Sequence, residues 1–365
     1  MEKLKVLWLN WRCWLNPAMG GAEIFTHEVA KRWAKAEIDV TLFTSKFLNC
    51  KPDEILEGIK IVRRGGKYSV YNEARKYYEK NSSKEGFDVV VDEVNTRPFS
   101  TPKFVKVGTK IVALIHQLAR EYWFYETPFP ISYLGFHLLE KRWLKPYKKI
   151  PTVTVSESSR KDLIDLGFEQ VFVVGEGLNF KPVEKLCAKK NPIIIYSGRL
   201  KKAKRPGDAI GAFKIIKEKV PEAQLWVIGD GYLKEKLTST SCDGVSFFGS
   251  VSNEERRKLI QGASCLVNPS VREGFGLNVV EANALGVPCV AYDVAGLRDS
   301  VKHGETGLLV KSGDVHALAD AILRILGCNT LRAQLSQKAL EYSSTFSWDR
   351  VADEFAKIIR KANSV

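Results

Sequence analysis

The sequence has 365 residues, of which 45% are hydrophobic and 27% are charged, so it suits two globular domains rather than one or a disordered chain. Its net charge of +14 favours anionic partners such as nucleic acid, acidic lipid or phosphorylated small molecules, although adaptation for solubility alone gives the same charge. The seven cysteines are scattered and never form CxxC, which argues against a zinc site and a disulfide framework. We see no apolar run of transmembrane length and no signal-peptide pattern, and we therefore expect a cytoplasmic protein.

In the first half of the chain, short runs rich in Val, Ile and Leu alternate with amphipathic segments. The runs predict strands over 5–9, 39–44, 87–91, 110–115, 151–155 and 171–174. Phe25, Val29 and Trp33 recur at helical spacing and predict a helix over about 22–35. Such alternation of strands and helices indicates a parallel sheet covered by helices.

The pattern starts again after a polar stretch over 180–191. It predicts strands over 193–196, 225–228, 245–248, 264–267, 287–291 and 307–310, and helices over 206–219, 253–262, 277–285, 314–326 and 348–361. We therefore expect an α/β chain with two Rossmann-like, doubly wound domains over 1–185 and 186–345, followed by a C-terminal helix within 346–365. Since open α/β sheets bind ligands at the carboxyl ends of their strands, we expect the site in a cleft between the domains.

Two features of the first half are candidates for ligand contacts. Gly20 and Gly21 lie between the first strand and the first helix, where they serve either a close approach to a phosphate or sugar, or a tight turn alone. His116 ends the strand over 110–115 and could hydrogen-bond a sugar hydroxyl, although a lone histidine is more often structural.

A basic loop follows the first strand of the second domain. Arg199 and Lys204 could converge there on a diphosphate and neutralise it as a leaving group without a metal. The alternative is a solvated basic loop, since Lys201, Lys202 and Arg205 surround them.

The most specific motif is the run 273–277, with sequence EGFGL, followed by Glu281 on the helix over 277–285. Its glycines expose backbone N–H groups at a helix start, which suits a phosphate. Glu273 can accept hydrogen bonds from sugar hydroxyls, and Glu281 lies about two helical turns further on, at the depth of a ribose. The alternative is a surface helix on which Glu281 forms an ordinary salt bridge. In both cases the Glu281 carboxylate needs a partner, because its neighbours on the helix are apolar.

Together these motifs resemble the retaining nucleotide-sugar glycosyltransferases of the GT-B fold, in their large fourth family. The residues that carry the resemblance are Gly20 to Glu23, His116, 155–158, Gly198 and Arg199 with Lys204, 229–231, 248–251, and Glu273 with Glu281. The resemblance implies that Arg199 and Lys204 bind the donor diphosphate, and that Glu273 holds the donor sugar. It places Phe275, Gly276 and Leu277 near sugar and phosphate, Glu281 on the ribose, His116 at the reaction centre, and Gly20 and Gly21 against the phosphate or the acceptor. We add Val251 to the donor-binding residues. Gln117 departs from the family, which often has an acidic residue after this histidine.

The resemblance implies a retaining hexosyltransferase of the glucose or mannose class, which uses a UDP- or GDP-sugar and needs neither cofactor nor metal. A nucleotide-sugar 2-epimerase of the same architecture is an alternative. Such an enzyme would need additional acid–base histidines and carboxylates in its cleft, and the whole chain has only five histidines. A nucleic-acid-binding protein is a second alternative, supported by charge alone and by no known signature. We therefore expect no nucleic-acid partner.

Residues 122–149 combine aromatic and basic side chains. Nine aromatic residues lie among Lys141, Arg142, Lys145, Lys148 and Lys149, a composition typical of a membrane interface with anionic lipid; the aromatic residues are Tyr122, Trp123, Phe124, Tyr125, Phe129, Tyr133, Phe136, Trp143 and Tyr147. The same residues could instead pack onto the N-terminal core. We favour the membrane reading, in which the enzyme is peripheral on the inner face of the membrane and its acceptor is a sugar, lipid-linked or part of a glycolipid.

Overall fold

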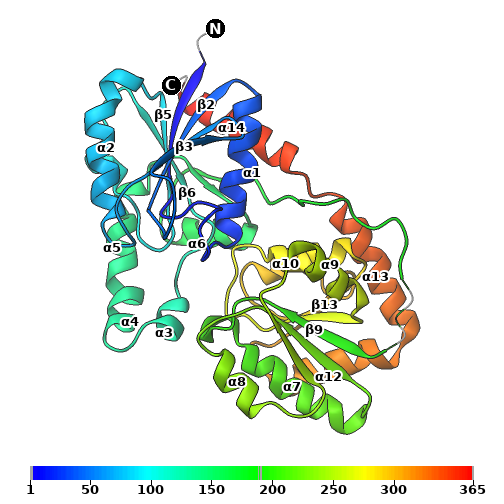
Figure 1. Cartoon of the computed structure of the whole chain (residues 1–365). Helices are drawn as coiled ribbons and strands as arrows, with labels where there is room; N and C mark the ends of the chain where they lie inside the picture. The colour runs from blue at the N-terminus through cyan, green and yellow to red at the C-terminus, as the bar shows by residue number, and fades with distance from the viewer. Residues whose placement is uncertain (1–2, 188, 190, 364–365) are drawn as a thin grey trace. The chain divides into compact units, whose positions relative to one another are not determined.

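The chain forms two compact units in the computed structural model, which describes residues 3–187, 189 and 191–363 (Figure 1). Unit 1 comprises Met1–Arg120, Leu134–Gly177 and Ser347–Val365, and unit 2 comprises Glu121–Tyr133 and Leu178–Phe346. This division differs from the boundaries that we expected: the chain enters unit 2 after Gly177 rather than after 185, and the stretch 121–133 belongs to unit 2. No helix of the described residues is long and apolar enough to cross a membrane.

Unit 1 is built on one sheet of eight strands in the order β3-β4-β2-β1-β5-β6-β7-β8. All neighbours pair in parallel except β3 and β4. The strands are β1 (Leu4–Leu9), β2 (Ile38–Thr44), β3 (Asp53–Leu56), β4 (Ile59–Arg63), β5 (Val89–Glu93), β6 (Lys110–Leu114), β7 (Thr152–Thr154) and β8 (Val171–Val173). Because the strand order reverses between β1 and β5, the carboxyl ends of these two strands flank the expected ligand position.

The helices of unit 1 cover both faces of this sheet. They are α1 (Gly21–Lys35), α2 (Val70–Glu85), α5 (Glu140–Leu144), α6 (Glu157–Asp165) and α14 (Trp348–Asn363), with short helices η1 (Thr101–Lys103), η2 (Gly135–Leu139) and η3 (Lys145–Tyr147). The short helix α4 (Ile131–Leu134) leads into η2. Figure 1 shows α14, in red, beside α1, in blue.

The last helix packs on the first through aromatic side chains. The ring of Trp33 on α1 lies 5.2 Å from that of Trp8 on β1 and 5.0 Å from that of Phe355 on α14. The Trp33 indole N–H donates to the carbonyl of Ala352 at 2.9 Å. Aromatic pairs at this spacing add to the free energy of apolar burial, so α14 is an integral part of the core of unit 1.

Among the elements of unit 1 that are absent from our prediction are β3, β4 and α2. Helix α2 buries only Val70, Ala74 and Tyr78, one residue per turn, so its apolar stripe is too thin to give a clear periodic signal. Strand β5 lies two residues further on than predicted because it includes buried Asp92 and Glu93, which an apolar run omits.

Unit 2 has a wholly parallel sheet of six strands in the order β11-β10-β9-β12-β13-β14. The strands are β9 (Ile193–Ser197), β10 (Gln224–Ile228), β11 (Val245–Gly249), β12 (Cys265–Asn268), β13 (Cys289–Tyr292) and β14 (Gly307–Val310). The helices are α3 (Tyr122–Glu126), η4 (Lys202–Lys204), α7 (Pro206–Lys219), α8 (Lys234–Thr240), α9 (Asn253–Gly262), α10 (Leu277–Ala284), α11 (Leu297–Ser300), α12 (Val315–Gly327) and α13 (Asn329–Ser343).

Each face of this second sheet has its own apolar core. One core includes the inner residues of α7 and α12, and the other includes those of α9 and α10. The predicted start of α9 is confirmed, since the Ser252 hydroxyl accepts the backbone N–H of Glu255 at 3.1 Å. The strand order diverges from β9, toward β10 on one side and toward β12 on the other. The loops after β9 and β12 therefore meet at a topological switch point.

Candidate functional site

The loop after β9 lies directly against the loop after β10. The backbone N–H of Gly198 donates to the carbonyl of Ile228 at 3.0 Å, and that of Leu200 donates to the carbonyl of Asp230 at 2.8 Å. Gly229 has φ +128°, and a Cβ there would lie 2.0 Å from the carbonyl oxygen of Gly198. Only glycine fits this contact, which fixes where Arg199 leaves the sheet.

Lys204 and Glu273 come together across the switch point. The Lys204 ammonium donates to Oε1 of Glu273, and the Ser270 hydroxyl donates to the same oxygen at 2.8 Å. Burial lowers the pKa of Lys204, but the attraction of Glu273 outweighs it and raises that pKa overall. The sequence placed both residues in one site, and the structure brings them into direct contact.

Two further cations lie beside this pair. Burial, and then repulsion by Arg199, lower the pKa of Lys201 to about 8. Arg199 itself is exposed, and within the described residues neither Arg199 nor Lys201 forms an ion pair. The loop thus concentrates positive charge, with one carboxylate, Glu273, bonded to Lys204.

The start of α10 faces this same switch point. Gly276 caps the helix with φ +100°, and Leu277 is its first residue. The side-chain amide of Asn278 donates to the carbonyl of Ser197 at 2.9 Å, which ties the helix start to the end of β9. Asn278 is not among the site residues that the sequence predicted. Phe275 is buried, with its ring centroid 5.5 Å from that of Phe346.

Glu281 has the partner that its surroundings require. Both of its oxygens accept from the Arg256 guanidinium of α9, each at 2.7 Å. A carboxylate has about four acceptor positions, so Glu281 keeps capacity for ribose hydroxyls beyond this bidentate pair. Val251 is half-buried and packs against the core beneath α9 and α10.

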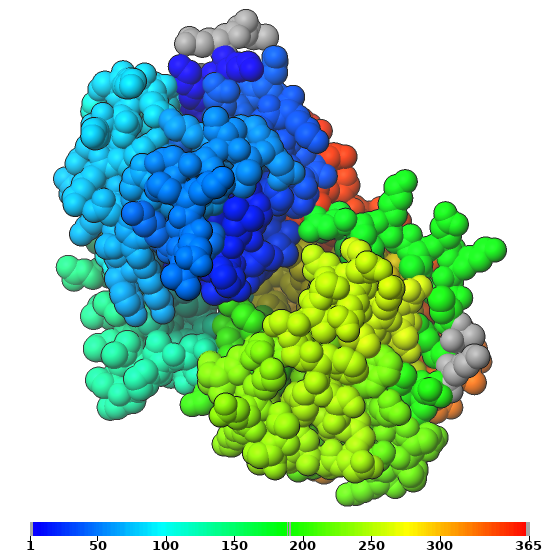
Figure 2. All heavy atoms as spheres, viewed as in Figure 1, coloured from blue at the N-terminus to red at the C-terminus, as the bar shows by residue number. Residues whose placement is uncertain are grey.

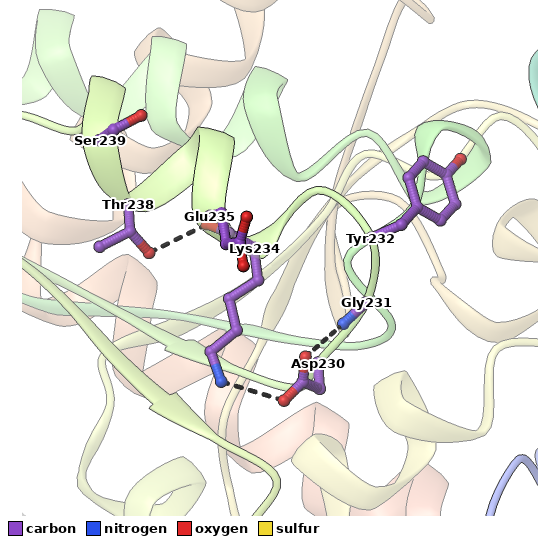
Figure 3. A pocket seen from close by; sticks show the side chains of 7 residues that line it. All are labelled: Asp230, Gly231, Tyr232, Lys234, Glu235, Thr238 and Ser239. Carbon is purple, nitrogen blue, oxygen red and sulfur yellow. Dashed lines mark hydrogen bonds and ion pairs between the residues drawn. The ribbon is translucent and has the colours of Figure 1, made fainter.

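A pocket lies at the loop after β10, the loop that contacts the basic loop through the hydrogen bond from Leu200 to Asp230. It is lined by the loop after β10 and by one face of α8; the residues are Asp230, Gly231, Tyr232, Lys234, Glu235, Thr238 and Ser239 (Figure 3). Asp230 is held by the Lys234 ammonium at 3.0 Å and by the backbone N–H of Gly231 at 2.7 Å. The pocket falls within 229–251, a stretch bounded by two of the motifs that carry the family resemblance, 229–231 and 248–251.

Unit 1 has a separate buried polar cluster at the carboxyl edge of its sheet. His116 follows β6, and its Nε2 lies 3.3 Å from Oε1 of Glu93, the last residue of β5. The other oxygen of Glu93 accepts the Trp8 indole N–H at 2.8 Å and the Thr26 hydroxyl at 2.5 Å. Glu93 therefore holds the imidazole in one orientation.

A second buried carboxylate lies on the other side of the imidazole. Oε1 of Glu176, in the loop after β8, is 4.0 Å from Nδ1 of His116, and its Oε2 has no hydrogen-bond partner in the described residues. Burial raises the pKa of Glu176 to about 8; His116 opposes this rise and Glu93 adds to it. Burial lowers the pKa of His116, but Glu93 and then Glu176 raise it overall.

The glycine turn before α1 belongs to the same edge of unit 1. Gly20 is the N-terminal cap of α1, and its N–H donates to Oε2 of Glu23 at 2.5 Å; Gly21 begins the helix. Glu23 also pairs with Arg12 at 3.0 Å. Gln117 leaves its side-chain oxygen buried and unpaired within the described residues.

Glu93 and Glu176 are absent from the residues that the sequence predicted for the site, although both come at or just after the end of a strand, as His116 does. Their buried carboxylates lie at a ligand-binding edge, which is the signal that could have found them. Within the described residues, no group of three or more His, Cys, Asp or Glu side chains is arranged to hold a metal ion.

Comparison with known proteins assigns a family to each half of the chain. The model described as Glycosyltransferase Family 4 matches residues 19–181, and the model described as Glycosyl transferases group 1 matches residues 179–342. The chain is 30% identical over 250 residues to EpsD of Bacillus subtilis (strain 168), covering 62% of this chain and 64% of that protein. It is 28% identical over 233 residues to the D-inositol 3-phosphate glycosyltransferase of a Nocardioides species, and this alignment covers 56% of this chain and 51% of that protein. These alignments thus span less than two thirds of the relatives' own lengths.

Solved structures match over nearly the whole chain. Sucrose-phosphate synthase from Thermosynechococcus elongatus has a TM-score of 0.80 at 20% identity, covering 98% of this chain and 99% of that one. Anabaena HepE in complex with UDP and glucose has a TM-score of 0.72 at 17% identity, and the match covers 98% of this chain and 100% of that one. The fold is GT-B, with two Rossmann-like domains, as the sequence predicted. By its motifs, its fold and the two models that together match residues 19–342, this chain belongs to the group 1 glycosyltransferases of the fourth family.

Proposed function

We propose that this chain transfers a sugar from a nucleoside-diphosphate donor to an acceptor hydroxyl, and that unit 2 binds the donor. The observation that carries the proposal is the grouping of Arg199, Lys201 and Lys204 around Glu273 at the switch point, facing the start of α10. Fixed cations and helix-start N–H groups are what a diphosphate requires. Family membership favours a transferase over the epimerase and over the nucleic-acid-binding protein.

Each site residue then has a proposed role. Arg199 and Lys204 bind the diphosphate, and Glu273 accepts hydrogen bonds from the donor sugar. The backbone at Phe275, Gly276 and Leu277 lies near sugar and phosphate, Glu281 binds the ribose, and Val251 contacts the nucleoside. In unit 1, His116 serves the reacting sugar, and Gly20 and Gly21 border the phosphate or the acceptor.

We propose a hexose of the glucose or mannose class, carried by UDP or GDP. The structural neighbour solved with UDP and glucose supports a uridine donor without excluding GDP. In retaining transfer, the bond from the anomeric carbon to the diphosphate oxygen breaks, and its electron pair leaves with the diphosphate. The acceptor oxygen bonds to the same face of the sugar, and its proton passes to the departing phosphate oxygen. Arg199 and Lys204 stabilise the charge that develops on that oxygen.

A transfer assay tests this function directly. The chain is incubated with UDP- and GDP-hexoses and candidate acceptors in the presence of a chelator, and the anomeric configuration of the product is read by NMR. We expect release of one nucleoside diphosphate with retention and without added metal. An inverted product would refute retention, and activity that depends on added metal would refute metal independence.

Binding of the diphosphate should be coupled to proton uptake at Lys201. The pKa of Lys201 is lowered to about 8, so this side chain is partly neutral at pH 8. A bound anion favours the charged form, and about half a proton should enter per ligand at pH 8, but almost none at pH 6.5. Calorimetry of UDP or GDP binding in buffers of different ionisation enthalpy measures this uptake. Lys201→Met should abolish it, and buffer-independent binding by the unmodified chain would contradict the assignment.

We further propose that the stretch 124–138 contacts an anionic membrane at the inner face, where a lipid-linked sugar would be the acceptor. Of the aromatic residues that we expected there, Trp123 and Tyr147 are buried in the protein, whereas Phe124 and Phe129 are 48% and 81% exposed. Further exposed apolar residues are Ile131, Tyr133, Leu134 and Leu138, followed by exposed Lys141, Arg142 and Lys145. Atoms of this stretch, cyan-green in Figure 2, lie at the surface.

Liposome flotation tests the membrane proposal. The chain should float with anionic liposomes at low salt and much less at high salt, because screening weakens surface charge interactions. Phe129→Asp combined with Leu138→Asp should abolish flotation. Tyr68→Asp, which changes an exposed aromatic residue elsewhere in unit 1, should not. Absence of flotation at low salt would remove the idea.

A further inference from the structure

Four neighbouring loops of unit 1 carry positive charge only. Strands β4, β2, β1 and β5 are adjacent and parallel, so the loops that follow them lie side by side at the carboxyl edge of the sheet. We call these loops, 64–69, 45–52, 10–20 and 94–101, the cationic edge. They contain no Asp or Glu, and their basic residues are Arg12, Lys46, Lys51, Arg64, Lys67 and Arg97.

Hydrogen bonds join the first three of these loops into one surface. The Ser45 hydroxyl, after β2, donates to the carbonyl of Trp11, after β1, at 2.5 Å. The backbone N–H of Lys46 donates to the carbonyl of Gly65, after β4, at 2.9 Å. The positive charges of these loops therefore belong to one connected part of unit 1.

The fourth loop is joined to the same surface and to the cluster around His116. The side-chain amide of Asn95 donates to Oδ1 of Asn10 at 3.3 Å, and the amide of Asn10 donates to the Thr26 hydroxyl at 3.0 Å. The Thr26 hydroxyl donates to Glu93 at 2.5 Å, and Glu93 is the partner of His116. The cationic edge is thus fixed to the residues that we assign to the reacting sugar.

Most of the charge on the cationic edge is uncompensated. Arg12 pairs with Glu23 at 3.0 Å, and Arg64 pairs with Asp53 at 2.7 Å. The other basic residues are exposed and form no ion pair with any residue that the structure describes; they are Lys46, Lys51, Lys67 and Arg97. Like charges gathered on one surface attract a multiply charged anion.

Arg97 is the unpaired cation of this edge that the structure holds in place. Its guanidinium lies over the Tyr71 ring, 4.5 Å from the centroid, and that ring lies 4.9 Å from the ring of Phe99. The backbone N–H of Arg97 donates to the carbonyl of Asn95 at 3.0 Å, and Thr96 between them has φ +74°. This conformation is costly for a β-branched residue, and such strain is concentrated at functional sites. A cation that served solubility alone would need neither the ring nor the strained turn.

A phosphate group has the chemistry that this arrangement recognises. A guanidinium can donate two parallel N–H groups to phosphate oxygens while its face stays on an aromatic ring. The unpaired lysines of the same edge add attraction for a group with more than one negative charge. Since we assign the donor diphosphate to unit 2, a phosphate on unit 1 belongs to the other substrate.

We propose that the acceptor of this transferase carries a phosphate group and that Arg97 binds that group on the cationic edge. This inference rests on the proposed function, because it assumes that unit 2 binds the donor and unit 1 the acceptor. A soluble sugar phosphate and a polyprenyl-phosphate-linked sugar would present the same chemical group to the guanidinium. The experiment therefore has one arm for each source.

Calorimetry of the full chain at low ionic strength tests the inference, with UDP or GDP present at saturation to occupy unit 2. The probes are glucose 6-phosphate, with glucose as its control, and neutral phosphatidylcholine vesicles with and without a polyprenyl phosphate. We expect at least one phosphorylated probe to bind more tightly than its control. Arg97→Gln should weaken that Kd about tenfold, as for loss of one charge-assisted hydrogen bond. Arg97→Lys, which keeps the charge, should lose less.

Lys106→Gln is the matched control, because it removes the same charge from the same connection between β5 and β6. The Lys106 ammonium lies close to the start of β6 and donates to the Ser83 hydroxyl at 3.2 Å, away from the cationic edge. Its substitution should leave the Kd of the probe within about twofold of the unmodified chain, as for a screened surface charge. Arg97→Gln should leave the Kd of UDP or GDP and the midpoint of urea unfolding unchanged, which a merely structural role would alter.

The outcomes separate this inference from the proposed function. Binding of glucose 6-phosphate that depends on Arg97 indicates a soluble acceptor, and such binding by the polyprenyl phosphate vesicles alone indicates a lipid-linked one. If the chain binds neither UDP nor GDP, the proposed function fails. If a nucleotide binds but neither phosphorylated probe does, the proposed function stands and the phosphorylated acceptor is refuted. Equal losses in Arg97→Gln and Lys106→Gln would show attraction by overall charge only, which also overturns the inference.

Discussion

Lys204→Ala should lower kcat/KM for the donor sugar by about 10²- to 10³-fold, the usual cost of removing one preorganised group that stabilises a developing negative charge. Lys204 is the cation that is ion-paired to Glu273, and its loss leaves that carboxylate near the diphosphate without its ammonium. Binding and chemistry should both suffer, so KM should rise and kcat should fall. Initial-rate kinetics with saturating acceptor measure both quantities.

Lys202→Ala is the matched control for this variant. Lys202 is exposed, and its contact with Tyr232 uses only its backbone N–H, so the substitution removes one positive charge from the loop without changing that contact. We expect it to change kcat/KM by less than about threefold, as for a screened surface charge. Arg199→Ala should resemble Lys204→Ala. Full activity in either the Arg199 or the Lys204 variant would count decisively against the donor site.

Glu176→Gln should stabilise unit 1 increasingly as the pH rises from 4.5 to 8. The pKa of Glu176 is raised from 4.5 to about 8, so the folded chain keeps a proton that the unfolded chain releases within this window. Stability therefore falls with rising pH across it, and an amide, which does not titrate, removes this loss. We expect a gain on the order of 1–3 kcal/mol at pH 8 and little change at pH 4.5.

His116 also makes the free energy of unfolding fall as the pH rises, so its effect must be separated from that of Glu176. Its folded pKa is raised above 6.5, so its stabilising contribution is present below pH 6.5 and is lost as the pH rises through the folded value. Glu176→Gln should retain this part of the pH dependence, and the double variant with His116→Gln should lose it too. Urea unfolding at a series of pH values gives these free energies. Parallel pH curves for Glu176→Gln and the unmodified chain would show that Glu176 is not buried as a neutral acid.

The fold was largely predictable because buried parallel strands are continuous apolar runs. The helix over 206–219 was predicted to the residue, since apolar residues recur along its buried side and Pro206 marks its start. In unit 1, β3 and α2 were missed because they are half-exposed and have only a few apolar positions. Periodicity weakens where an element covers the edge of a sheet rather than its centre.

The candidate site was predictable in part, where one motif supplied several residues. Lys204 and Glu273 follow two strands that meet at a switch point, so their contact follows from topology. Contacts between distant segments were not predictable. Glu126 lies 77 residues before Ala203, whose backbone N–H it accepts, and no local pattern in the sequence marks that pairing.

Thermal unfolding of the full chain with UDP, GDP and the corresponding monophosphates, without metal, tests most directly whether unit 2 binds a donor diphosphate. At least one diphosphate should raise Tm clearly more than its monophosphate does, and Lys204→Ala should remove this difference. If no diphosphate raises Tm, or if mono- and diphosphates act alike, the basic loop of unit 2 does not bind a donor diphosphate.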